Sequence, residues 1–518
     1  MGSLDASLSR YPVLTDPRPH DTTLPAFMVS TTRGFLPRMD PIALLPPEFA
    51  PLESLLQRMP VRTASGEPGL LDPERPGSDG EGNDLKEAVL RELPDLTEAV
   101  DKYKDNLPLV NALYRDYSFL ASAYLLEPCH ASFVRGEGYG LGRDVLPACV
   151  ARPIARCAQI CGFKPFMEYA GSYALYNYRL VDPSLGLTSS NLRLIRAFER
   201  GLDPTSSEAG FVLVHIEMVK NSGPLISGTI SALDTVLPPT TNPPSPSPPT
   251  YHNRAALNTS LHQILSSLRS INHVMETMWH RSKPTDYTSF RTFIFGITSQ
   301  SMFPNGVIYE GVAALGDKPA SFRGESGAND SMIPLVDNLC NIPMPATPLT
   351  EILKDFRAYR PGEHRAFLEW VARASEEGGL KEWALGLGGL ENGDGDGEEE
   401  EEEEEELLRE SRALWLQILD QVRDFRWRHW CFAREYIIKR TSHPTATGGS
   451  PIVTWLPNQL AAVMDEMGKL YEKVGGGGGG GLGVEVERIM DLVARQREML
   501  RKEVRKFCEE RGVEVEGV

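Results

Sequence analysis

The sequence predicts a mainly α-helical protein. Long segments repeat apolar residues three and four positions apart, which is the spacing of one helix face. Strand-like runs do not alternate with helical ones in the order of βαβ units, so a parallel α/β sheet is not expected. Hydrophobic residues make up 41% of the 518 residues, which is enough for a sizeable buried core. At roughly 100–200 residues per domain, a chain of this length has about two to four domains.

Composition divides the chain into successive parts. Pro, Gly and Ser are frequent up to residue 84, helical periodicity then begins, and a Pro/Ser/Thr stretch that cannot pack interrupts it. The predicted parts are an extended, partly disordered N-terminal arm (1–84), a smaller N-terminal domain (85–234), a linker (235–252) and a larger, all-helical domain (253–518). Two low-complexity inserts, near 388–406 and 475–481, are expected to be disordered loops of the larger domain.

Charge and cysteine content exclude several classes of protein. The net charge is −18, and the nine glutamates of Glu398–Glu406 supply half of it. A nucleic-acid-binding protein usually carries a basic face, so we expect no nucleic-acid partner. No apolar run reaches about 18 residues, and the first residues lack an apolar signal segment. The seven cysteines show no paired spacing. We expect a cytoplasmic protein with reduced thiols and no membrane contact, and take it to be monomeric.

One helical segment, Leu407–Ile438, places a histidine among core residues. Its apolar positions are Leu414, Ile418, Val422, Phe425, Phe432 and Tyr436. His429 fills the gap of seven residues between the fourth and the fifth of them. A lone histidine on an apolar face is most often a hydrogen-bonded core residue.

The functional alternative for His429 is an iron ligand of haem. One histidine suffices for that role, and a flat macrocycle suits an apolar helix face. Zinc would need a local cluster of His and Cys, which the sequence lacks. Arg426 lies one turn earlier on nearly the same face and would bind a haem propionate, because guanidinium pairs with carboxylate in a bidentate way.

Ser326 stands in a near match to the nucleophile elbow of serine hydrolases, within Gly324–Ala328. That motif needs a preceding strand, whereas Gly316–Arg323 contains Pro319 and several charges. The simpler interpretation is a tight glycine loop before a helix, which brings backbone N–H groups close to a ligand.

Three other segments are open to two interpretations each. Phe211 and His215 lie four residues apart on one helix face and form either core packing or one wall of an apolar pocket. Arg291, among apolar neighbours, is either a solvated surface residue or a buried cation for a carboxylate ligand. Thr447–Ser450 is a flexible loop that serves either as a lid or as a plain linker.

Taken together, these segments resemble the indoleamine 2,3-dioxygenase family, in its fungal branch. The resemblance covers about residues 90 to 460 and is specific because the motifs occur in order. The matching pieces are Leu146-Pro147, Arg152-Pro153, Tyr169-Ala170, Asn177-Tyr178, Asp182-Pro183, Phe211–Glu217, Arg291, Gly296, Gly306–Gly311, Phe322–Asp337, Phe356–Pro361, His364-Arg365, Arg426, His429, Tyr436 and Thr447–Ser450.

The resemblance implies a smaller N-terminal domain and a larger helical domain with haem b between them. It implies that His429 is the proximal iron ligand, that Arg426 contacts a propionate and that Asp337 holds Arg426. The implied distal and substrate residues are Tyr169, Ser172, Phe211, His215, Arg291, Ser326, Ala328 and Thr447. Among these, Arg291 would bind the substrate carboxylate, Thr447 would lie on the closing loop, and His215 is the candidate for a direct polar role.

This chain departs from the family pattern at a few positions. Asp286 stands where an indole-contacting aromatic residue is expected, which would weaken that wall of the pocket. His215 replaces a distal serine, Ala446 replaces the first glycine of the loop, and Phe356 replaces a methionine. A neutral imidazole at position 215 would accept the indole N–H or donate to bound oxygen, depending on its tautomer.

The resemblance implies a haem-dependent dioxygenase that opens the indole ring of L-tryptophan with O2 to give N-formylkynurenine, towards NAD precursors. The main alternative is a haem-binding sensor or carrier of the same fold without turnover, which Asp286 and Ala446 leave open. A serine hydrolase at Ser326 and a cofactor-free helical scaffold are weaker alternatives.

Overall fold

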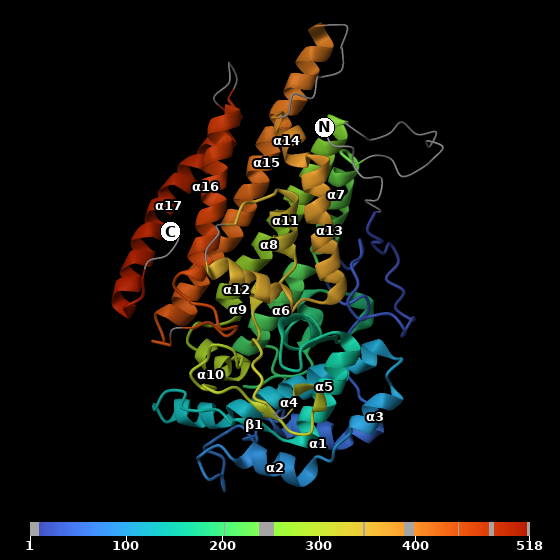
Figure 1. The fold of residues 1–518 in the computed structure, drawn as a ribbon, viewed down its shortest axis with the longest axis vertical. Helices are drawn as coiled ribbons and strands as arrows, with labels where there is room; N and C mark the ends of the chain where they lie inside the picture. The colour runs from blue at the N-terminus through green and yellow to red at the C-terminus, as the bar shows by residue number, and fades with distance from the viewer. Residues whose placement is uncertain are drawn as a thin grey trace.

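The computed structural model is built mainly from α-helices, which confirms the predicted fold class (Figure 1). Helices between residues 47 and 161 gather at one end of the molecule, and long helices from the second part of the chain run along its longest axis. The structure describes residues 10–200, 202–237, 253–316, 318–344, 348–387, 398–443, 445–475 and 481–514.

The first part of the chain is organised around a buried central helix, α4. Its elements are η1 (Pro47–Phe49), α1 (Ala50–Arg58), α2 (Asp84–Glu92), α3 (Thr97–Lys102), α4 (Leu107–Val134), β1 (Val145–Leu146), α5 (Ala148–Cys161), η2 (Tyr169–Tyr173), β2 (Tyr178–Leu180), η3 (Pro183–Leu185), η4 (Ser189–Asn191), β3 (Leu192–Leu194), α6 (Ser207–Val219) and α7 (Ser222–Asp234). Asn106 caps α4 by accepting the Leu109 N–H at 3.2 Å, and Pro108 occupies the first turn. Most side chains of α4 are buried, so the helix runs through the core rather than along the surface.

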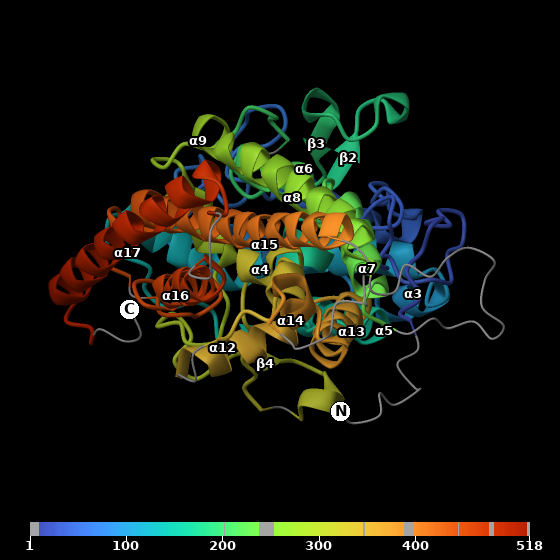
Figure 2. The same ribbon diagram turned by 90° about the horizontal axis from the view of Figure 1, so that it is seen from above.

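The second part is a stack of long helices around α15. Its elements are α8 (Arg254–Glu276), α9 (Met278–Arg281), α10 (Tyr287–Arg291), η5 (Thr292–Ile294), β4 (Ile308–Tyr309), η6 (Ala313–Leu315), η7 (Gly327–Asn329), α11 (Met332–Leu339), α12 (Pro348–Arg357), α13 (Gly362–Gly378), α14 (Leu380–Leu385), α15 (Glu398–Phe432), η8 (Ala433–Ile438), α16 (Trp455–Gly475) and α17 (Val484–Arg511). Seen from above, α15 runs beside α8 and close to α16 (Figure 2).

Two short strand pairs tie distant segments together. β1 pairs with β4 in parallel, with Val145 opposite Ile308, so the first part of the chain is joined directly to the second. β2 and β3 form an antiparallel pair in which Tyr178 is opposite Leu194. Two elements, η2 and η8, are π-helical, a conformation found most often at functional sites.

The structure differs from the predicted organisation in three places. The N-terminal arm is packed rather than extended, because apolar residues such as Phe27 and Phe35 are buried in the core. Helices α6 and α7 belong by sequence to the smaller domain, yet they pack against α8 of the larger one. The glutamates 398–406 form the first turns of α15, since glutamate favours helices and negative charge favours their N-termini. The predicted linker from residue 238 to 252, and most of both inserts, lie outside the described residues.

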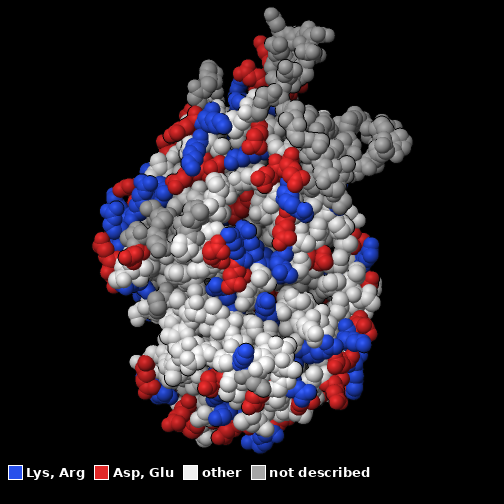
Figure 3. Space-filling model, viewed as in Figure 1, with Lys and Arg blue, Asp and Glu red and all other residues white. Residues whose placement is uncertain are grey.

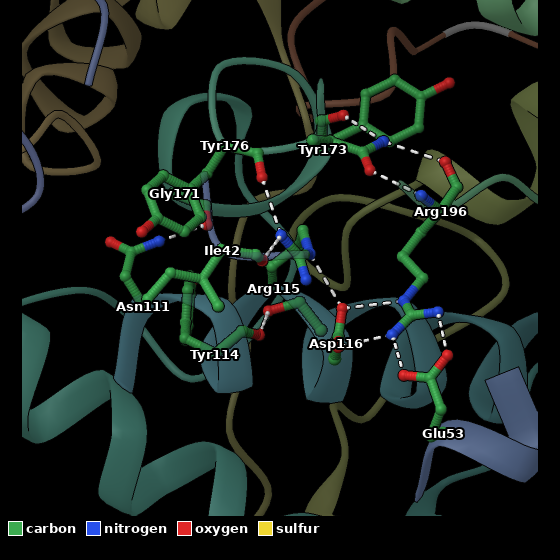
Figure 4. Close-up of polar contacts among 12 residues, drawn as sticks. Ile42, Glu53, Asn111, Tyr114, Arg115, Asp116, Gly171, Tyr173, Tyr176 and Arg196 are labelled. Carbon is green, nitrogen blue, oxygen red and sulfur yellow. Dashed lines mark hydrogen bonds and ion pairs between the residues drawn. The ribbon is translucent and has the colours of Figure 1, made fainter. Parts of the chain in front are cut away.

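A buried network of charged side chains fixes η2 on α4 (Figure 4). Asn111 donates to the Gly171 carbonyl at 2.9 Å, and Arg115 donates to the Tyr176 carbonyl at 3.1 Å. Asp116 accepts from Arg115 at 2.8 Å and from Arg196 at 2.9 Å, and all three side chains are almost fully buried. Burial alone would raise the pKa of Asp116, but the two guanidinium groups outweigh it and hold that pKa below its usual value.

The face of the molecule seen in Figure 3 carries no large patch of one charge. Acidic and basic side chains are interspersed over the face in Figure 3, and a broad region between them carries few charges. Among the described residues, no helix combines the length and the apolar character that crossing a bilayer requires.

Candidate functional site

A cavity lies where the two parts of the chain meet. Its walls come from η2, α6, the Glu325–Asp330 segment, the end of α15 with η8, and residues 446–456. Most of the lining side chains are apolar or aromatic, and both π-helical elements contribute to them. A cavity with this lining is suited to a flat, mainly apolar ligand.

His429 faces this cavity from the last turn of α15. No hydrogen bond from a described residue reaches its imidazole. Burial, together with the nearby His215 and Arg426, lowers the pKa of His429 to about 4. The imidazole is therefore neutral at pH 7, which is the form that binds a metal ion.

Arg426 lies one turn before His429 and is anchored by a carboxylate. Its Nη2 lies 2.6 Å from Asp337 Oδ2 in a buried ion pair. Arg426 Nη1 and Asp337 Oδ1 are also buried, and neither has a hydrogen-bond partner among the described residues. Burial raises the pKa of Asp337, and Arg426 opposes that rise. The free Nη1 donor is positioned to bind a second anion.

His215 faces the same cavity from α6. Its Nδ1 lies 2.8 Å from the Phe211 carbonyl, so Nδ1 carries the proton and Nε2 is an acceptor. A Cβ atom on Gly327 would lie 3.8 Å from that Nε2. Tyr169 packs edge-on against the imidazole with ring centroids 5.8 Å apart, and burial lowers the pKa of His215. The side chain is thus a neutral hydrogen-bond acceptor.

The Gly324–Ala328 loop forms a wall of the cavity through Ser326 and Ala328. A Cβ atom on Gly324 would lie 2.2 Å from the Gly296 N, so only glycine fits there. Arg360 donates to the Ala328 carbonyl at 3.1 Å and holds the loop. The Ser326 hydroxyl accepts the Ala328 N–H at 3.3 Å and contacts no described histidine, which disfavours the serine hydrolase alternative.

The loop around Thr447 lies over the cavity. Thr447 Oγ1 donates to the Glu325 carbonyl at 2.8 Å, and the Thr447 carbonyl accepts the Gly296 N–H at 2.9 Å. Gly449 has φ +84°, and a Cβ there would lie 2.5 Å from the Thr298 carbonyl oxygen. Since Ala446, Thr447 and Ser450 all line the cavity, the loop is in the position of a lid.

Four predicted site residues do not line the cavity: Ser172, Arg291, and the paired Arg426 and Asp337. The Ser172 hydroxyl lies 2.8 Å from the Glu168 carbonyl and 2.9 Å from the Glu168 N, because the π-helical turn directs it into its own backbone. Arg291 is fully buried, donates to the Thr445 carbonyl at 3.0 Å and lies over the Phe295 ring. Arg291 has no acidic partner among the described residues, so it still lacks an anion.

Asp286, which stands where an aromatic wall residue was expected, does not line the cavity. It accepts from the Ser207 hydroxyl at 2.8 Å, while the adjacent Tyr287 lines the cavity. Sequence reasoning missed two other lining residues, the buried acids Glu325 and Asp330. The sequence did indicate their position, since both acids lie in or beside the glycine loop that was predicted to contact a ligand.

The site offers two separate histidines, His215 and His429, rather than a cluster, to any metal. Within the described ranges there is no group of three or more His, Cys, Asp or Glu side chains that could hold a metal ion. His429, which has no hydrogen bond from a described residue, lies on an apolar cavity of a helical protein, which is the arrangement of a haem ligand. The unpaired Arg426 Nη1 beside it would meet a propionate, so these residues fit haem.

The comparison with known sequences identifies the family. The family described as "Indoleamine 2,3-dioxygenase" matches residues 23–482, and the chain belongs to this family of haem-dependent dioxygenases. A mouse indoleamine 2,3-dioxygenase 2 is 27% identical over 238 residues, which are 46% of this chain and 53% of the relative. The chain thus matches about half the length of that relative.

Fungal relatives match over more of their length. An indoleamine 2,3-dioxygenase of Aspergillus nanangensis is 24% identical over 376 residues, covering 71% of this chain and 80% of the relative. A 6-hydroxytryptophan 2,3-dioxygenase of Fusarium equiseti is 22% identical over 357 residues, covering 68% of this chain and 74% of the relative. These relatives support the predicted resemblance, including its fungal side.

Proposed function

We propose that this protein is a haem-dependent dioxygenase that cleaves the indole ring of L-tryptophan with O2 to give N-formylkynurenine. The observation that carries the proposal is the neutral, unpartnered imidazole of His429 on the wall of a largely apolar cavity. Family membership supplies the reaction class, and the names of relatives cover tryptophan-like indoles.

The residues that would hold haem b are those whose ligand or hydrogen-bond donor atoms have no partner among the described residues. His429 would ligate the iron, and Arg426 Nη1 would donate to a propionate while Asp337 keeps the guanidinium in place. Ser326 and Ala328 would line the opposite face. When bound, the iron supplies oxygen binding and activation, which no side chain in the cavity supplies.

The chain itself orients the substrate and excludes water. In the reaction the bond between indole C2 and C3 breaks, and each carbon gains one oxygen atom, so no external electron donor is consumed. The aromatic side chains of Tyr169, Phe211 and Tyr287 give the indole a flat, dry wall. The loop carrying Thr447 closes the remaining side.

His215 is the side chain proposed for a direct polar role. Its free Nε2 is an acceptor and would take a hydrogen bond from the indole N–H. Phe211 holds the imidazole in this orientation through its carbonyl and its ring, whose centroid lies 5.0 Å away. Ser172 acts only through η2, because its hydroxyl is occupied by Glu168.

Arg291 is proposed to neutralise the substrate carboxylate from behind Tyr287. Its guanidinium is buried without an acidic partner among the described residues, and its Nε has no hydrogen bond there. Arg291 lowers the pKa of Tyr287 through its charge and a hydrogen bond, against the larger effect of burial, and Tyr287 lines the cavity whereas Arg291 does not. A carboxylate bound on that side would supply the negative charge that the buried guanidinium lacks.

In its cellular setting, we propose a cytoplasmic monomer that catalyses the first step of the kynurenine route towards NAD precursors. The test is to load the purified protein with haem, reduce it, record its spectrum, and add L-tryptophan in air. We expect a histidine-ligated haem spectrum and N-formylkynurenine. A haem spectrum without product would favour the sensor or carrier function, and no haem spectrum would overturn the proposal.

A further inference from the structure

Helix α17 lies beyond the residues that the family match covers. The match ends at residue 482, and α17 comprises Val484–Arg511. The helix packs against α15 and α16 (Figures 1 and 2). The structure describes all of its residues, and none of them lines the cavity. Any effect of α17 on the site is therefore exerted through the segments that it contacts.

Hydrogen bonds anchor α17 on α15 and η8. Glu503 accepts from Trp430 Nε1 at 2.7 Å and from Arg434 Nη1 at 2.5 Å. One helical turn further on each side of this contact lies another, in which Gln496 accepts from Arg423 Nη1 at 2.7 Å. These contacts fix the position of α17 along α15, and with it the place where α17 ends.

The last residue of α17, Arg511, binds carbonyl groups at the end of η8 and in the segment that follows. Its Nη2 donates to the Ile438 carbonyl at 2.7 Å and to the Thr441 carbonyl at 2.8 Å. Its Nη1 lies 3.5 Å from the His443 carbonyl oxygen. The last carbonyls of a helix have no partner within the helix, and the helix dipole favours a cation beside them. Arg511 therefore caps η8 and extends to the segment that leads into the loop of Thr447.

The loop itself is held by other side chains. Arg291 donates to the Thr445 carbonyl at 3.0 Å, and Gln300 donates to the Ala446 carbonyl at 2.7 Å. The loop is thus attached at its own backbone by the body of the protein and, just before it, by α17. A loop that closes over a site turns about a few residues at its ends. The residues that Arg511 holds are at one of these ends.

We propose that Arg511 is a positioning residue, which keeps the backbone between η8 and the loop in place as the hinge on which the loop closes over the cavity. Without its guanidinium, the carbonyls of Ile438 and Thr441 lose a charged donor. The hinge then loosens, and the closed position of the loop is less populated. The consequence for substrate affinity rests on the dioxygenase function above, whereas the consequence for the loop does not.

The experiment measures hydrogen–deuterium exchange by mass spectrometry in the purified 518-residue chain. It compares the wild type, Arg511→Ala, Arg511→Lys and Arg505→Ala, the last as the matched control at an exposed position on α17. We expect Arg511→Ala to speed exchange in residues 445–450 by about tenfold, as for the loss of one charged hydrogen bond. Arg511→Lys should have a smaller effect, because an ammonium group still donates to a carbonyl, and the control should match the wild type.

Steady-state kinetics of the haem-loaded protein give a second measurement. In Arg511→Ala, KM for L-tryptophan should rise by about fivefold, because closure of the loop contributes to substrate binding. The value of kcat and the histidine-ligated haem spectrum should not change, since Arg511 contacts neither the cavity nor His429. A role in overall folding alone would not separate KM from kcat in this way.

The outcomes separate this proposal from the dioxygenase function. Unchanged exchange in residues 445–450 of Arg511→Ala, or an equal change in Arg505→Ala, would overturn the role of Arg511. Faster exchange that extends equally through α15 and α16 would also overturn it, because Arg511 would then stabilise the whole fold. A wild type that forms no product would overturn the dioxygenase function, while the exchange rates still test Arg511. If Arg511→Ala does not fold, an Arg511→Lys variant that exchanges like the control would overturn the proposal.

Discussion

The two walls of the cavity differ in how the charged groups behind them are paired, although the Tyr169 and Tyr173 hydroxyls of η2 have no partner among the described residues. On the η2 wall, Asn111, Arg115, Asp116 and Arg196 bond to one another and to backbone carbonyls, so the charges beneath the wall are largely paired within the chain. On the α15 wall, the imidazole of His429 and Arg426 Nη1 have no partner among the described residues. Buried polar groups are normally paired, so the first wall is a scaffold and the second is completed by a ligand.

The largest effect of a substitution is expected at His429. We expect His429→Ala to lose stable haem binding, because the α15 wall then offers the iron no other ligand. The measurement is the haem content after gel filtration of loaded protein. His273→Ala, at an exposed position on α8, is the matched control and should keep its haem. Full haem occupancy in His429→Ala would contradict the assignment.

A substitution at Asp116 tests whether the network behind the η2 wall is a scaffold. Asp116→Ala leaves Arg115 and Arg196 without their shared buried carboxylate, and removing one partner of a buried ion pair costs about 3–5 kcal/mol. Urea unfolding of the haem-free protein would measure the loss. Asp465→Ala, which removes a half-exposed partner of Arg497, should cost about 1 kcal/mol or less. Equal costs in the two variants would show that the network is not a scaffold.

The same carboxylate gives the stability a defined dependence on pH. Because the pKa of Asp116 is lower in the folded state than in the unfolded state, its stabilisation is present above the unfolded value of about 4. It is lost as the pH falls through the folded value. The difference in unfolding free energy between wild type and Asp116→Ala should therefore shrink on acidification below about pH 4. A difference that grows there would contradict the sign of the shift.

A smaller effect is expected at Arg426. Arg426→Leu removes the donor for a propionate and leaves Asp337 buried alone, so haem affinity should fall by about tenfold to a hundredfold, as for one charged hydrogen bond. Haem transfer to an acceptor protein measures it. Arg428→Leu is the control on the same helix, because Arg428 pairs with Asp424 and Glu276 at partly exposed positions. Similar losses in both variants would mean that Arg426 acts only on the helix.

The smallest effect is expected at Thr447, on the loop that lies over the cavity. Thr447→Ala removes the hydrogen bond to the Glu325 carbonyl, which contributes about 1 kcal/mol, so KM for L-tryptophan should rise about fivefold. Haem content should not change. Thr447→Ser keeps the hydroxyl and should behave like the wild type in steady-state kinetics. A fall in kcat with unchanged KM would place Thr447 in the chemical step rather than in closure.

Much of the α15 wall could be predicted from the sequence, whereas much of the η2 wall could not. The gap of seven residues filled by His429 follows from helix periodicity, which local sequence determines. Ser172 and Arg291 lie away from the cavity because a π-helical turn and packing on Phe295 decide their directions. Helix periodicity in the sequence predicts neither of these side-chain directions. Glu325 was hidden for the same reason, since only the folded chain brings it beside Tyr169 and Tyr287.

The most direct test of the central claim is the fate of oxygen. Haem-loaded, reduced protein is given L-tryptophan under ¹⁸O2, and the product is analysed by mass spectrometry. The account predicts N-formylkynurenine with two labelled oxygen atoms, one on each carbon of the broken C2–C3 bond. A product with one labelled atom or none, or no turnover of any indole by protein with a histidine-ligated haem spectrum, would contradict it.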